Sequence, residues 1–133
     1  MKLKRIVVTL CLLVVCSAAF ALARPAKRID ERTQTCRVLN SGPLEMASRP
    51  YGEGGKLFVA LCKSCHYRNN DKGASFLWAE SKTSKAWNRV FAQRYPQCAK
   101  AGEWDTLTEE QLMRVNDYLY RFSYDSRDNF DNC

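Results

Sequence analysis

Two cysteines and the only histidine of the chain lie within five residues, in the stretch Cys62-Lys63-Ser64-Cys65-His66. Thiols three positions apart can add to the two vinyl groups of one haem, and the histidine that follows can bind the iron through a ring nitrogen. The spacing therefore predicts one covalently attached haem c. Cys62 and Cys65 are the expected thioethers, and His66 is the expected proximal iron ligand.

Three other interpretations of the same residues compete with haem attachment. The motif could bind zinc with Cys98 as a fourth ligand, but such sites usually have two separated ligand pairs, and adjacent Cys65 and His66 fit poorly around one tetrahedral ion. A thiol–disulfide exchange motif should follow a strand in a βαβ unit, whereas this one ends a helical pattern. The third interpretation is an ordinary disulfide between Cys62 and Cys65 beside an unrelated histidine.

Residues 1–23 have the layout of a secretory signal peptide. Three basic residues precede an apolar run over residues 6–15, and Ala-Leu-Ala at 21–23 matches the small-x-small pattern of a cleavage site. We expect cleavage after Ala23, a periplasmic or otherwise exported domain, and no membrane span after cleavage. Left uncleaved, residues 6–23 are just long enough to anchor the chain in a bilayer.

The charge pattern indicates an ordinary solvated surface of mixed charge rather than a nucleic-acid-binding one. The formal net charge is +7, and loss of the signal peptide, which has three basic and no acidic residues, reduces it to +4. Basic and acidic residues alternate along the chain, and no basic stripe carries regularly spaced aromatic residues, so nucleic-acid binding is not indicated. A weakly basic face suits docking to acidic redox partner proteins.

The cysteine count limits the pairing of the thiols. Of the seven cysteines, five lie beyond the signal peptide. In an oxidising compartment unused cysteines tend to pair, so an odd number implies that at least one has another role or stays free. These five are Cys36, Cys62, Cys65, Cys98 and Cys133.

Beyond the signal peptide, the pattern divides the chain into an arm, a helical domain and a tail. Residues 24–52 are polar, contain three prolines and show no sustained period, so they are expected to form an extended arm. Residues 53–123 form the predicted domain, and residues 124–133 are expected to be a loose polar tail. We find no strand with convincing alternation, and we predict a mostly α-helical fold.

Three helices are predicted within the domain. The first runs from Lys56 into the cysteine motif, and the second begins near Ser84 and is stopped by Pro96. The third begins after Thr106 or Thr108, because Thr106 with Glu109 and Thr108 with Gln111 both fit a capping box. Its expected buried stripe is Leu112, Val115, Tyr118, Leu119 and Phe122.

Residues 54–122 resemble the monohaem class I c-type cytochromes. The resemblance is carried by GGKLFVALCKSCH and by VNDYLYRF in the last helix. It implies a compact helical domain around one haem, and a one-electron carrier between redox proteins rather than an enzyme. In the family a glycine and an aromatic residue of the first helix pack on the last helix, roles that fit Gly54 or Gly55 and Phe58 on one side, and Val115 and Tyr118 on the other. Leu119 would face the haem edge.

The sixth iron ligand departs from the family pattern. The family supplies a methionine from the loop before the last helix, but residues 95–106 contain none. Cys98 lies in this loop, where Lys100 is a weaker donor. Met113 lies on the third helix, nearly opposite its buried stripe, and Met46 lies in the arm. We rank Cys98 or an open position first, then Met113, then Met46.

The resemblance also bears on cysteine pairing and on the class of function. If the terminal helices cross as in the family, the arm and the tail emerge close together, so Cys36 and Cys133 would pair and Cys98 would be left. A six-coordinate iron favours electron transfer. The alternative is a haem-based small-ligand sensor or a peroxidase-like module with an open or cysteine-ligated iron, since an open site allows small ligands to bind, although no second histidine is present to act as a distal acid or base.

Overall fold

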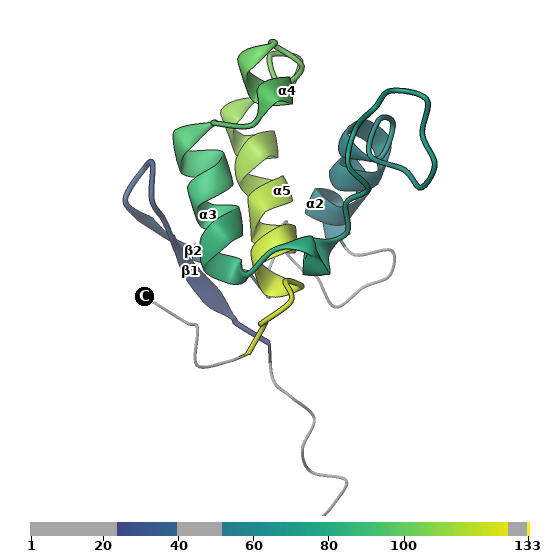
Figure 1. The fold of residues 1–133 in the computed structure, drawn as a ribbon. Coiled ribbons are helices and arrows are strands. Elements are labelled where there is room, and N and C mark those ends of the chain that lie inside the picture. The colour runs from purple at the N-terminus through teal and green to yellow at the C-terminus, as the bar shows by residue number, and fades with distance from the viewer. Residues whose placement is uncertain (1–23, 40–51, 128–132) are drawn as a thin grey trace, which may run out of the picture.

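A computed structural model describes residues 24–39, 52–127 and 133. The predicted signal peptide and Met46 lie outside these residues. Within them, no helix is long and apolar enough to cross a membrane. The elements shown in Figure 1 are β1 (Lys27–Asp30), β2 (Thr35–Val38), α2 (Gly52–Leu57), the π-helical turn η2 (Phe58–Cys62), the 3-10 turn η3 (Ala79–Ser81), α3 (Ser84–Gln93), α4 (Gln97–Lys100) and α5 (Glu109–Arg121).

Helix α5 forms the centre of the domain, with α2 on one side and α3 on the other (Figure 1). Of the two predicted capping boxes, the second begins this helix: the Thr108 side chain accepts the N–H of Gln111, and the Gln111 side chain accepts the N–H of Thr108. The predicted stripe is also confirmed. Leu112, Val115, Tyr118 and Leu119 are buried, and Phe122 is partly buried against the core.

Helix α3 confirms the second predicted helix. Thr83 caps its first turn by accepting the N–H of Ala86. Trp87 and Val90 face the core, and the indole N–H of Trp87 donates to the carbonyl of Ala79 at 2.7 Å. The helix ends at a left-handed residue, Arg94, before Pro96.

Helix α2 crosses α5 at a glycine. A Cβ atom on Gly54 would overlap the carbonyl oxygen of Arg114 and would lie 3.0 Å from the Cβ of Tyr118. One turn later, the ring of Phe58 lies 5.8 Å from that of Tyr118. The prediction that the helix begins at Lys56 is wrong. It begins at Gly52, because the glycines that look like a helix break allow the close approach to α5.

The expectation of an irregular arm without strands is wrong for residues 27–38. These residues form an antiparallel hairpin, in which Ile29 is opposite Cys36. The hairpin places charged rather than apolar side chains inward, since Arg28 is fully buried and Asp30 is almost so. A search for alternating apolar residues cannot find such a strand.

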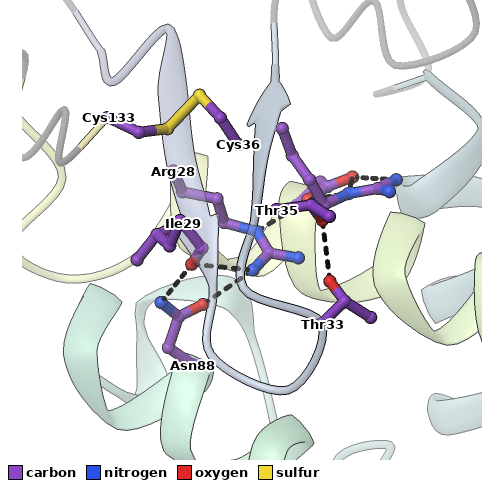
Figure 2. The surroundings of a disulfide bond; sticks show 9 residues. Arg28, Ile29, Thr33, Thr35, Cys36, Asn88 and Cys133 are labelled. Atoms are coloured by element: carbon purple, nitrogen blue, oxygen red, sulfur yellow. Dashed lines mark hydrogen bonds and ion pairs between the residues drawn. A yellow bond between two sulfur atoms is a disulfide. The ribbon is translucent and has the colours of Figure 1, made fainter.

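A buried polar network attaches the hairpin to the helices. The guanidinium group of Arg28 donates to Asp117 at 2.6 Å, to Asn88 at 3.0 Å and to Asp30 at 3.0 Å. Asn88 in turn donates to the carbonyl of Ile29 at 3.1 Å (Figure 2). Arg28 and Asp117 are both excluded from water, so their charges must be compensated within the network, in which Asp117 also pairs with Arg37 at 2.8 Å.

A disulfide joins the hairpin to the last residue of the chain. Cys36 and Cys133 are bonded, with their Cα atoms 5.8 Å apart (Figure 2). The pairing expected from the resemblance is therefore present. The start of the predicted loose tail is also ordered, because the Asp125 carboxylate accepts the N–H of Ser84 at 2.7 Å.

Candidate functional site

The cysteine motif lies where the first helical segment ends. The carbonyl oxygen of Cys62, the last residue of η2, accepts the N–H groups of Cys65 at 3.3 Å and of His66 at 2.9 Å. These bonds fold the motif into a tight turn, so the second thiol and the imidazole follow directly after the helix. The predicted site residues are therefore positioned by the same element that packs on α5.

Both cysteines of the motif are free thiols, as is Cys98. Cys62 is partly buried against the hydrophobic core, while Cys65 and His66 are half-buried. The interpretation as an ordinary disulfide between Cys62 and Cys65 is therefore wrong for this structure, and both sulfurs are available for another bond.

The imidazole of His66 is held by a backbone carbonyl. Its Nδ1 atom lies 2.6 Å from the carbonyl oxygen of Ser75. Because a carbonyl can only accept, Nδ1 carries the proton, and the lone pair of the neutral ring is on Nε2. Metal-binding histidines are usually oriented in this way, with the second ring nitrogen donating to a carbonyl or a carboxylate.

The protonation of Cys62 argues against thiol–disulfide exchange. Burial, reinforced by the nearby thiols of Cys98 and Cys65, raises the pKa of Cys62 to about 12. Reactive cysteines of Cys-x-x-Cys oxidoreductases have pKa values below that of a free thiol, since the thiolate is the nucleophile. Cys62 has the opposite environment, which suits a sulfur that becomes a thioether inside a core.

The zinc interpretation also lacks support. Among the residues that the structure describes, no group of three or more His, Cys, Asp or Glu side chains is arranged to hold a metal ion. Cys98 is near enough to Cys62 to affect its pKa, but the two do not complete a metal site with His66.

The hydrophobic core against which Cys62 packs has further apolar and aromatic residues at its edge. Leu77, Phe91 and Trp104 are partly buried against the core, as is Cys62. The rings of Phe91 and Trp104 stack 4.9 Å apart. The donor set fits a covalently attached haem, which needs two free thiols and one oriented imidazole.

A groove elsewhere on the domain does not include the motif. It has a volume of about 300 Å³ and is lined by Trp78, Ala79, Glu80, Tyr118 and Phe122. Neither cysteine of the motif nor His66 lines it, so the groove is not the predicted attachment site.

The candidates for the sixth ligand lie in different places. Cys98 is half-buried on α4. Its thiol is near enough to that of Cys62 to help raise the pKa of Cys62. Met113 faces the hairpin, where its sulfur accepts the Nη1–H of Arg37 at 3.6 Å. The structure therefore brings Cys98, but not Met113, towards the cysteine motif.

Two features of the site were not predicted. The Ser75 carbonyl has no sequence signal, because every residue carries one. The contacts of Lys63, the residue after Cys62, were also missed, since a lysine between two cysteines suggests only a solvent-exposed charge.

No protein-family model, curated protein or solved structure matches this chain.

Proposed function

We propose that this chain is a periplasmic or otherwise exported c-type cytochrome that carries electrons one at a time between redox proteins. The observation that carries the proposal is the hydrogen bond between His66 Nδ1 and the Ser75 carbonyl, in a motif with two free thiols. This bond leaves Nε2 to bind iron. A thiol-exchange site or a plain disulfide has no use for such an orientation.

Each residue of the motif has a defined role in this proposal. Cys62 and Cys65 tether the haem c through thioethers, and His66 is the proximal ligand. When bound, the haem supplies an iron that changes its charge by one electron. Phe58, the first residue of η2, packs on Tyr118 at the crossing of α2 and α5 and so fixes the start of the turn that leads into the motif.

Cys98 is the candidate that best fits the sixth position. The disulfide between Cys36 and Cys133 leaves it as the one unpaired cysteine outside the motif among the described residues. A thiolate ligand stabilises ferric iron and gives a lower reduction potential than methionine does. A low-potential carrier would exchange electrons with partners of similarly low potential, and the weakly basic surface favours acidic ones.

A second candidate function follows from the position of Met113. Its sulfur accepts a hydrogen bond from Arg37 on the hairpin, and residues 95–106 contain no methionine. An iron that lacks a strong sixth ligand would bind small molecules, which gives a haem-based sensor or a peroxidase-like module. Because His66 is the only histidine, a distal acid or base would have to be another residue type.

Absorption spectroscopy of the exported protein tests both candidates. The pyridine haemochrome spectrum should be that of a haem with two saturated vinyl groups, and a spectrum with no haem would overturn the proposal. Carbon monoxide added to the reduced protein should leave an electron carrier with a strong sixth ligand unchanged. Fast binding would favour the sensor. Cys98→Ala should change the spectrum, whereas Met113→Leu should not.

A further inference from the structure

The side chain of Lys63 folds back onto the backbone on both sides of the loop that follows the motif. Its Nζ atom donates to the carbonyl oxygen of His66 at 3.2 Å and to that of Leu77 at 2.9 Å. Leu77 also donates its N–H to the carbonyl of His66 at 3.2 Å. Three hydrogen bonds thus close the loop from His66 to Leu77 at its base.

Two aromatic rings complete the surroundings of the ammonium group. The Nζ atom lies 4.1 Å from the ring centre of Phe76 and 4.2 Å from that of Trp78. The two rings are edge to face, with centres 5.7 Å apart. A cation so close to two ring faces is attracted by both, and it adds a second contact to the Trp78 ring, which otherwise meets Phe76 and is 47% exposed.

The segment that Lys63 holds is the one that orients the histidine. Ser75, whose carbonyl is 2.6 Å from His66 Nδ1, directly precedes Phe76 and Leu77. If this segment moves away, the carbonyl moves with it, and the imidazole loses the partner that sets its tautomer.

We propose that Lys63 is a positioning residue for His66, which fixes the Ser75 carbonyl and through it the proton on Nδ1. Its importance for the iron rests on the proposed function, whereas its effect on the imidazole does not. The residue type directly after Cys62 would then affect the site. Only a long side chain that ends in a cation can both donate to the Leu77 carbonyl and lie over the rings of Phe76 and Trp78.

The test is the rate at which the Nδ1 proton of His66 exchanges with solvent, measured by NMR on ¹⁵N-labelled, full-length exported protein. Lys63→Met keeps the stem and removes the ammonium, and it should speed exchange about tenfold, the effect of losing a charge-assisted hydrogen bond. Lys63→Arg keeps the cation and should restore a rate within about twofold of wild type. Lys72→Met is the matched control. It removes a lysine from the same loop that makes only a long ion pair, 3.9 Å, with Asp71, and it should leave the rate unchanged.

The outcomes separate this proposal from the proposed function. A wild-type rate in Lys63→Met overturns the positioning role, as does an equal rise in Lys63→Met and Lys72→Met. Trp78→Leu is a second variant, which removes one ring beside the ammonium group but keeps the hydrogen bonds of Lys63. It should therefore speed exchange of the Nδ1 proton less than Lys63→Met does. The mass of each NMR sample shows whether haem is attached, and the exchange rate can be read with or without it. Absence of haem therefore counts against the proposed function alone.

Discussion

The Nδ1 atom of His66 lies 2.6 Å from the carbonyl oxygen of Ser75, nine residues further along the chain. This bond sets both the tautomer and the plane of the imidazole before any ligand is bound. Nε2 is then the nitrogen with a lone pair, in a turn that also holds the thiols of Cys62 and Cys65. A preset imidazole requires little reorganisation when it binds a metal, which is why we regard this bond as the central feature of the site.

The crossing of α2 and α5 predicts a strong effect of Gly54→Ala. The added Cβ atom would overlap the Arg114 carbonyl, a backbone atom that can move only if α5 moves. We expect a loss of about 3 kcal/mol in the free energy of unfolding, measured by urea denaturation. Gly73→Ala is the control, because that glycine has a φ of +67° but nothing within 4 Å, and it should cost only about 1 kcal/mol. Equal effects of the two substitutions would contradict the close crossing.

The buried network predicts that Arg28→Met destabilises the domain by about 3 kcal/mol or more, because it leaves the buried Asp117 carboxylate with one guanidinium partner fewer. Arg32→Met removes the exposed pair with Glu109 and should cost less than about 1 kcal/mol. Urea denaturation of both variants is the measurement. If the loss in Arg28→Met is as small as in Arg32→Met, the hairpin is not held by this network.

Glu110 predicts a loss of stability in acid. The hydrogen bond from Arg37, opposed by burial and aided by Arg114, holds the pKa of Glu110 below its ordinary value of 4.5. A carboxyl group with a lowered folded-state pKa contributes stability above the unfolded value, and the contribution is lost as the pH falls through the folded value. Glu110→Gln should therefore reduce the fall in stability below pH 4.5. Parallel stability curves for wild type and variant, from urea denaturation across this range, would rule the contribution out.

The disulfide predicts a large stabilisation of the whole domain. Cys36 and Cys133 are 97 residues apart, so their bond restricts nearly the entire unfolded chain. Replacing both by serine should lower the free energy of unfolding by about 4 kcal/mol. A reducing agent should do the same to wild type and should leave the double variant unchanged. If the double variant is as stable as wild type, the bond does not constrain the unfolded chain as proposed.

The sequence was sufficient for α3 and α5 because each has a local signal. Thr108 and Gln111 form a side-chain cap that is visible in the sequence, and Pro96 must end a helix. The hairpin has no such signal. Its inward residue Arg28 is stable there because Asn88 and Asp117 meet it from helices far along the chain, and Arg28 in turn pairs with the inward carboxylate of Asp30. Pairing of this kind depends on the tertiary structure and cannot be read from a local pattern.

The same distinction applies to the candidate site. Cys62, Cys65 and His66 could be selected from spacing, because their chemistry depends on side chains close in sequence. The partners of His66 could not, because the Ser75 carbonyl belongs to the backbone and Lys63 acts through carbonyl groups and ring faces. The closeness of Cys98 to Cys62 depends on how α4 approaches the motif, which again is set by tertiary packing.

The most direct test of the central claim is the intact mass of the protein purified from the exported fraction. We expect the mass of the chain without residues 1–23 plus that of one haem, which stays bound after denaturation in acid. Replacing both Cys62 and Cys65 by serine should remove that added mass. A wild-type mass equal to that of the bare polypeptide, from cells able to attach haem to another c-type cytochrome, would contradict the account.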